Sequence, residues 1–147
     1  YSHGMFSHTD TKPQKIVNNI LQNLNIKYTN EKIFGSYSAD NYLDDYNLII
    51  EVMGDFWHTN PLTNKISYPL QEKRIVCDYK KRCFIKTKYN INILYLWEND
   101  LYKNLNVCLE LIKLYLSFNG VLQNYNSFNY QIKDNNKLIL KTTGYIW

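Results

Sequence analysis

The sequence predicts an α+β domain in which a mixed central sheet packs against flanking helices. The chain has 147 residues, a length that fits one compact domain with a single core. Apolar residues recur at helical spacing in three long segments, and short runs of β-branched and aromatic residues lie between these segments. The alternation of the two patterns along one chain is typical of helices layered on a sheet.

The first predicted element is a helix over residues 11–24. Thr11 or Asp10 can act as its N-cap, Pro13 stands near its first turn, and apolar residues then recur every three or four positions. Residues 1–10 before it have no periodicity and are predicted to form a lead-in arm.

A strand and a hairpin are predicted next. Residues 28–34 fit a short strand that ends at a Gly-Ser turn at 35–36. Two extended runs then flank a polar turn at 44–47. The second run, 48–53, is almost wholly apolar, which favours a central strand.

The rest of the chain predicts a helix, a strand, a helix and a small C-terminal hairpin. The β-branched and aromatic strand has the profile of a second central strand. The predicted elements are a polar loop at 56–67, a Lys/Arg-rich helix at 70–89, the strand at 91–97, one helix from 99 or 100 to about 118, and a hairpin that turns at 134–136.

These elements divide the chain into three parts. Residues 1–10 are the lead-in arm, residues 11–119 form the main domain, and residues 120–147 form an extension that we expect to pack on it. The chain begins at Tyr1 rather than at a Met, so we expect that a segment upstream is missing.

Composition narrows the class of protein. The net charge of +4 permits a polyanionic partner without requiring one. Cys77, Cys83 and Cys108 contain no C-x-x-C pair, which argues against a disulfide framework and against a zinc site built from cysteines. No apolar run approaches the roughly 20 residues of a membrane span, so we expect a soluble protein in a reducing cytoplasm, without a membrane partner.

Two acidic residues are the strongest candidates for a metal site. Asp40 is predicted at the start of one strand and Glu51 within the next, so the two carboxylates can converge at one sheet edge. Such a pair suits Mg²⁺, which takes a few oxygen ligands and keeps waters for a phosphate. A carboxylate within an apolar strand is costly to bury alone. The alternative is that Glu51 faces solvent or pairs with a lysine.

A histidine and an aspartate are candidates for activating water. His58 follows Phe56-Trp57 after the apolar strand, and a neutral imidazole can take a proton from water. Asp78, on the basic helix, can hydrogen-bond the second ring nitrogen of His58. Alternatively, His58 is structural or merely exposed, and Asp78 is a helix-surface residue offset by neighbouring cations.

A basic cluster is a candidate nucleic-acid surface. Such a stretch can line a phosphate-binding groove, although a charge run on a helix can equally be one solvated face. Its candidate contacts are Lys73, Arg74, Lys80, Lys81 and Arg82, together with Trp57 in the preceding loop.

Taken together, these residues are recognisable as a set: Asp40-x10-Glu51-Val-Met-Gly-Asp-Phe-Trp-His58, then Asp78, then Ile-Leu-Tyr-Leu-Trp97-Glu98. The set resembles the very-short-patch mismatch repair endonucleases, whose fold is a variant of the PD-(D/E)XK nuclease core. It resembles still more closely the phage-type homing endonucleases of the EDxHD group. The resemblance covers roughly residues 11–101.

The resemblance implies roles for individual residues. Asp40 matches the family's metal-binding aspartate, and His58 and Asp78 match its base and the acid that supports the base. Val52 falls where the family supplies a metal ligand from a strand, which implies its backbone carbonyl. Gln14 stands at the catalytic position where the repair enzymes carry a helix glutamate.

A further departure is Met53, which stands where those enzymes carry another histidine or where typical nucleases keep a lysine. The general-base role therefore falls on His58.

The function expected from this resemblance is Mg²⁺-dependent hydrolysis of phosphodiester bonds in double-stranded DNA. The chain would be the catalytic domain of a homing endonuclease, acting in the cytoplasm of a bacterial or phage-infected cell as a monomer or a homodimer. The alternatives are a mismatch-repair or restriction nuclease of the same fold, a catalytically silent DNA-binding module, and a protein-interaction domain with surface tyrosines.

Overall fold

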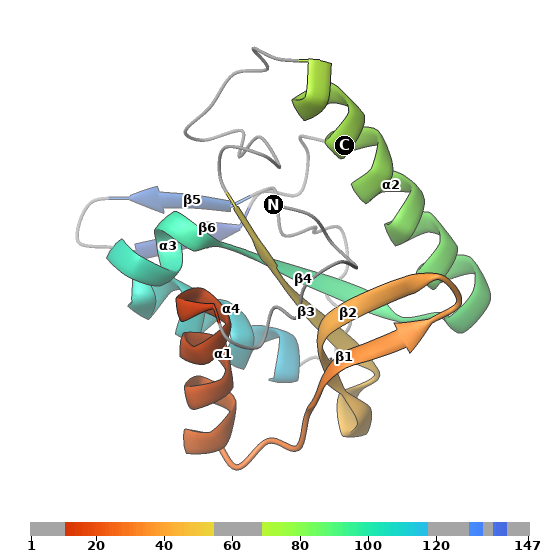
Figure 1. The fold of residues 1–147 in the computed structure, drawn as a ribbon. Helices are drawn as coiled ribbons and strands as arrows, with labels where there is room; N and C mark the ends of the chain where they lie inside the picture. Colours follow the sequence, from red (N-terminus) through yellow and green to blue (C-terminus); the bar gives the residue numbers. More distant parts are fainter. Residues whose placement is uncertain (1–10, 55–68, 118–129, 134–136, 141–147) are drawn as a thin grey trace.

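The fold is an α+β arrangement around a mixed four-stranded sheet (Figure 1). A computed structural model describes residues 11–54, 69–117, 130–133 and 137–140. Within these ranges the strand order is β1-β2-β3-β4, and β3 and β4 are the parallel pair. The predicted fold class, a mixed sheet flanked by helices, is confirmed.

Helix α1 (Lys12–Asn23) begins as its sequence predicts. The side chain of Thr11 accepts a hydrogen bond of 3.4 Å from the backbone N–H of Gln14, so Thr11 is the N-cap. The helix buries one face, on which Val17 and Leu21 are fully covered.

Strand β1 (Thr29–Phe34) ends at the predicted Gly-Ser turn, where Gly35 has φ of +63°, and pairs in antiparallel with β2 (Tyr37–Leu43). After a 3-10 turn at Asp44–Tyr46, strand β3 (Leu48–Met53) begins and pairs in antiparallel with β2, so the hairpin predicted around residues 44–47 is confirmed.

Every residue of β3 is buried, as its apolar sequence predicts for a central strand. Helix α2 (Pro69–Tyr89) leads to strand β4 (Asn92–Trp97), which pairs with β3 in parallel. The prediction of a second central strand is wrong, because β4 ends the strand order within the described ranges. It is nevertheless almost fully buried, so its apolar sequence reflects cover on both faces rather than a second strand neighbour.

The single helix predicted after β4 is two helices, α3 (Glu98–Lys103) and α4 (Leu105–Ser117). Asn104 separates them with φ of −130°. Its backbone N–H donates to the Asp100 carbonyl at 2.7 Å, and its side-chain Nδ2 donates to Asp100 Oδ1 at 3.0 Å. Asn favours helices less than Leu does, and the Asn104 carbonyl accepts the N–H of Val107 at 2.9 Å, which starts the second helix. Leu105, the first residue of α4, is 45 % exposed.

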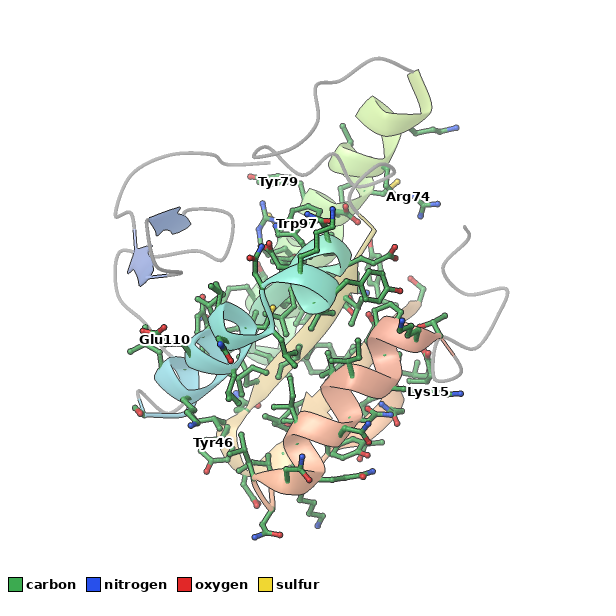
Figure 2. The ribbon with its side chains drawn as sticks, turned by 90° about the vertical axis from the view of Figure 1, so that its left-hand side faces the viewer. Lys15, Tyr46, Arg74, Tyr79, Trp97 and Glu110 are labelled. Atoms are coloured by element: carbon green, nitrogen blue, oxygen red, sulfur yellow. The ribbon has the colours of Figure 1, made fainter. Side chains whose placement is uncertain are left out.

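The helices cover two faces of the sheet. In Figure 1, α2 lies on one side and α1, α3 and α4 lie on the other. Figure 2 shows side chains of α1 and α4 filling the layer beside the sheet, whereas Lys15 and Glu110 point away from it.

The predicted C-terminal hairpin is confirmed as β5 (Tyr130–Lys133) and β6 (Lys137–Leu140). The predicted lead-in arm and the loop at 56–67 lie outside the described residues. Within the described part of the chain, none of the helices combines the length and the apolar composition that crossing a membrane requires.

Candidate functional site

The candidate site lies on the face of the sheet that α2 covers. Asn41 of β2 pairs with Ile50 of β3 and faces α1, since Gln14 of α1 donates to Asn41 Oδ1 at 2.7 Å. Side chains alternate between the two faces of a sheet. The next residues along each strand, Asp40 and Glu51, therefore lie on the α2 face.

Asp40 interrupts the sheet on both sides. In the β1–β2 ladder, the residues on either side of Asp40 are paired with β1, but Asp40 and the residue opposite it, Glu31, are not. Glu31 has φ of +54°. In the β2–β3 ladder, the pairing ends at Asn41 and Ile50. Asp40 was predicted at the start of its strand and at a sheet edge. Instead it lies in the middle of β2, between two neighbouring strands.

Side chains replace the missing ladder bonds at Asp40. Its backbone N–H donates to Oε2 of Glu51 at 3.0 Å, and its Oδ2 accepts the N–H of Val52 at 2.8 Å. Its carbonyl accepts Nδ2 of Asn30 at 3.0 Å and Nε2 of Gln14 at 3.3 Å. Buried backbone groups need such partners, so the two acidic residues hold β2 and β3 together where the ladder ends.

Lys81 of α2 completes the acidic centre. Its ammonium forms a salt bridge with Oε1 of Glu51 and donates to the carbonyl of Ser38 at 2.6 Å. The alternative that Glu51 pairs with a lysine is thus what the structure shows. The sequence predicts Lys81 as a phosphate contact, whereas in the structure it lies beside the acids.

Helical spacing was the signal that could have found Lys81. It lies three residues after Asp78 and four residues before Ile85, which is fully buried. Residues three and four apart share one helix face. Lys81 therefore had to face the sheet once Ile85 was recognised as a core residue.

The acidic centre contains two carboxyl groups and one ammonium group. Burial and the neighbouring Glu51 raise the pKa of Asp40 well above its usual range, although the Val52 hydrogen bond opposes this. Burial would also raise the pKa of Glu51, but the charge and hydrogen bond of Lys81 outweigh it, and the pKa of Glu51 is lowered. For Lys81, burial alone would lower the pKa, yet Glu51 raises it. The ammonium of Lys81 thus interacts electrostatically with two carboxyl groups and forms a salt bridge with that of Glu51.

The basic helix divides between two environments. Lys73 and Lys80 are exposed, whereas Arg74, Lys81 and Arg82 are half-buried. The sequence predicts either a solvated charged face or a basic surface that lines a groove. This helix has both a solvated face and an inward-facing basic face.

The guanidinium of Arg82 packs over aromatic rings. It lies 5.3 Å from the ring centre of Tyr79 and 5.9 Å from that of Tyr95. Tyr79 and Arg74 are labelled in Figure 2.

A cavity of about 360 Å³ adjoins the acidic centre. Pockets of this size hold small ligands or parts of larger ones. Its polar lining comes from β2, β3, β4 and α2, and it brings Asp78 next to Lys81. The principal polar lining residues are Ser38, Glu51, Arg74, Asp78, Lys81 and Tyr95.

Gln14 joins the site from the opposite face. Its side chain is fully buried, and its Nε2 group makes the bonds to Asp40 and Asn41. Its carbonyl oxygen Oε1 is buried and has no hydrogen-bond partner among the residues that the structure describes.

Among the predicted site residues, the structure brings together Asp40, Glu51 and Val52 on the strands, with Gln14 behind them and Lys81 and Asp78 on α2. His58 and Trp57 lie outside the described residues. Within the described ranges, no three His, Cys, Asp or Glu side chains form a group that could hold a metal ion by themselves.

The sequence matches no protein-family model and no curated protein. Among solved structures, the chain is similar to the catalytic domain of the homing endonuclease I-Bth0305I, with 20 % sequence identity and a TM-score of 0.47. The match covers 74 % of this chain and 97 % of that domain.

Proposed function

We propose that this chain is a Mg²⁺-dependent endonuclease that hydrolyses phosphodiester bonds of double-stranded DNA. The observation that carries the proposal is the buried pair Asp40 and Glu51, which meet on neighbouring strands, with Lys81 paired to Glu51 and a cavity beside Glu51. Burying two acids that share one counter-ion is costly unless another cation joins them.

The donor set fits Mg²⁺, which takes one or two carboxylates and fills its remaining positions with water and phosphate oxygens. Asp40 and Glu51 would hold the ion. The N–H and C=O groups of one strand residue point to the same side, so the Val52 carbonyl points toward β2, as its N–H does. That carbonyl is the third candidate ligand. Bound there, the ion would offset charge developing on the phosphate and the leaving oxygen.

His58 would accept the proton of the attacking water, and Asp78 would orient its imidazole. Asp78 lines the cavity next to Lys81, which is the side from which a phosphodiester can approach the carboxylates. Gln14 would act through Asp40, because its amide donates to the Asp40 backbone carbonyl and so holds this residue in place without bonding its carboxylate.

The partner we propose is duplex DNA. The positively charged side chains of Arg74 and Lys81 line the cavity. On the same helix, Lys73 and Lys80 are exposed to solvent. These groups, with Arg82 and Trp57 as further candidates, would contact backbone phosphates, which provide affinity without sequence information.

The residue pattern supports assignment to a PD-(D/E)XK-like nuclease related to the very-short-patch repair enzymes, and within these to a homing endonuclease of the EDxHD group. A mismatch-repair or restriction nuclease of that fold would share the same chemistry. We place its action in the bacterial or phage-infected cytoplasm.

Nicking of a supercoiled plasmid tests the proposal. We expect cleavage in Mg²⁺ and none in EDTA, and we expect Asp40→Asn and His58→Ala to abolish cleavage while DNA binding is retained. Asp45→Asn is the matched control, because Asp45 is an exposed acid in the turn that follows β2 and its loss should leave cleavage unchanged.

Two outcomes favour the rival functions. Salt-dependent DNA binding without nicking by the wild-type protein would identify a catalytically silent DNA-binding module. The absence of any salt-dependent DNA binding in a gel-shift titration would favour a protein-interaction domain.

A further inference from the structure

Lys81 spans the gap between α2 and both acidic strands. Its ammonium contacts the Ser38 carbonyl on β2 and the Glu51 carboxylate on β3, and only 14 % of its side chain is exposed. The sequence predicts a lysine that contacts DNA from a helix surface. The geometry instead makes Lys81 part of the acidic centre.

Both oxygens of Glu51 are engaged. Oε2 accepts the backbone N–H of Asp40, and Oε1 accepts the ammonium of Lys81. The first bond joins β2 to β3, so breaking it would part the strands. The second bond joins only a flexible side chain to the sheet, so it is the one that can be exchanged.

A buried ion pair is a weak source of stability, because its attraction must repay the loss of hydration of both ions. Lys81 also leaves the centre with one positive charge for two carboxyl groups. A second cation at Glu51 would be repelled by the ammonium as long as Lys81 stays in place.

Space for the ammonium lies next to its present position. Lys81 and Glu51 both line the cavity of about 360 Å³, and Asp78 and Arg74 line it further along α2. A lysine ammonium sits on a flexible stem of four carbons, so the Lys81 side chain can leave Glu51 without movement of the helix. Asp78 offers a second carboxylate beside the cavity.

We propose that Lys81 is a resident counter-ion that competes with a divalent cation for Glu51, and that its ammonium moves into the adjoining cavity when the cation binds. There it would face the phosphodiester. The proposal rests on the proposed function, since the divalent cation and the phosphodiester are its ligands.

Calcium binding without DNA tests the competition directly, and isothermal titration calorimetry measures it without any cleavage. We expect Lys81→Met to bind Ca²⁺ about tenfold more tightly than the wild type, because a like charge is removed from a buried position. The matched control is Lys80→Met, which removes the same charge from the adjacent exposed residue and should leave the affinity unchanged.

Three results would overturn the proposal: equal Ca²⁺ affinity in Lys81→Met and the wild type, weaker affinity in Lys81→Met, or equal tightening in both lysine variants. If Lys81→Met is unfolded in EDTA, circular dichroism during a Ca²⁺ titration decides the question. Refolding supports the proposal, because the metal then supplies the missing charge, and failure to refold overturns it.

Duplex DNA binding supplies a second readout. With Lys81 held on Glu51 in EDTA, we expect Lys81→Met to leave the affinity for a labelled duplex unchanged in fluorescence anisotropy. In Ca²⁺ we expect the same variant to weaken binding about tenfold, the scale of one lost contact to a charged group. If Lys81→Met changes the affinity for duplex DNA equally in EDTA and in Ca²⁺, the proposed movement of the ammonium is wrong.

The two proposals can fail separately. A wild-type protein that never nicks DNA, although Lys81→Met tightens Ca²⁺ binding, would refute the nuclease and leave the role of Lys81 intact. A protein that nicks DNA without any difference in Ca²⁺ affinity would refute only the role of Lys81. Absence of Ca²⁺ binding in both the wild type and Lys81→Met overturns the counter-ion proposal.

Discussion

The backbone N–H of Val52 donates a hydrogen bond of 2.8 Å to Oδ2 of Asp40, so a side chain takes the place of a strand carbonyl. In return, the N–H of Asp40 donates to Oε2 of Glu51 at 3.0 Å. Each acid of the candidate site is thus also a structural link between β2 and β3. Substitutions here can separate the charge of an acid from its role as an acceptor.

Asp40→Asn should keep the fold and lose the charge. Asparagine retains a carbonyl oxygen that can accept the Val52 N–H, and it removes a carboxyl whose pKa is raised by burial and by Glu51. In EDTA at neutral pH we expect Asp40→Asn to be at least as stable as the wild type. Asp40→Ala leaves the N–H without this acceptor and should cost about 1–3 kcal/mol.

Urea unfolding followed by circular dichroism measures both free energies. Equal stability of the Asn and Ala variants would show that the Val52 hydrogen bond contributes nothing to holding the strands together.

Gln14→Glu tests whether this position needs an amide. The Nε2 group donates to the Asp40 carbonyl and to Asn41 Oδ1, and a carboxylate cannot donate to either oxygen. The substitution also buries a charge next to Asp40. We expect a loss of about 2 kcal/mol or more in the free energy of unfolding, despite the favourable position of an acid in the first helical turn.

The matched control is Gln22→Glu on the same helix. Gln22 is exposed and its amide donates to the Tyr28 hydroxyl, so this variant should lose less than about 0.5 kcal/mol. If the two variants lose equally little in urea unfolding, the buried amide is not what fixes Asp40.

The sequence predicts elements that local patterns define. The cap at Thr11 and the apolar run of β3 need only a few adjacent residues, and both are present in the structure. The break at Asn104 was missed although its cause is also local, because the apolar residues on both sides continue with helical spacing.

The candidate site could be predicted only in part, because its geometry depends on tertiary packing. Asp40 and Glu51 were found from their residue types in extended segments. The interruption of the β1–β2 ladder at Asp40 lies opposite the positive φ of Glu31 on β1, which no local pattern marks. Lys81 was misplaced because the inward face of α2 carries charged residues such as Asp78, so the helix shows no clean apolar stripe.

Gly35→Ala should destabilise the β1–β2 hairpin. Gly35 has φ of +63°, a conformation that costs an L-residue about 1–2 kcal/mol, and an added Cβ would lie 2.8 Å from Cζ of Phe84. We expect a loss of at least this amount in urea unfolding. Gly54→Ala is the control, since an added Cβ there would meet no atom within 4 Å.

A double variant separates the two causes. Phe84→Leu shortens the side chain that the new Cβ would meet, so Gly35→Ala should cost less in that background than in the wild type. An identical cost in both backgrounds would assign the whole effect to the backbone conformation rather than to contact between the hairpin and α2.

Cys108 should resist alkylation in the native protein. It is 1 % exposed, and burial, followed by the charge of Asp100, raises its pKa to about 12. At pH 8 only about 10⁻⁴ of the thiol is then ionised, and the thiolate is the reactive form. Cys77 and Cys83 are exposed on α2. We therefore expect iodoacetamide to add two groups rapidly and a third only when the protein unfolds.

Intact-mass spectrometry follows the additions, and peptide mapping assigns them to residues. The raised pKa means that Cys108 stays protonated in the fold through neutral pH, so its protection should persist until unfolding exposes it. A Cys77→Ser, Cys83→Ser variant isolates this thiol, and its alkylation rate in increasing urea should follow the unfolded fraction. A rate in native buffer equal to that of the exposed cysteines would contradict the packing of α4 against the sheet, on which the burial of Cys108 depends.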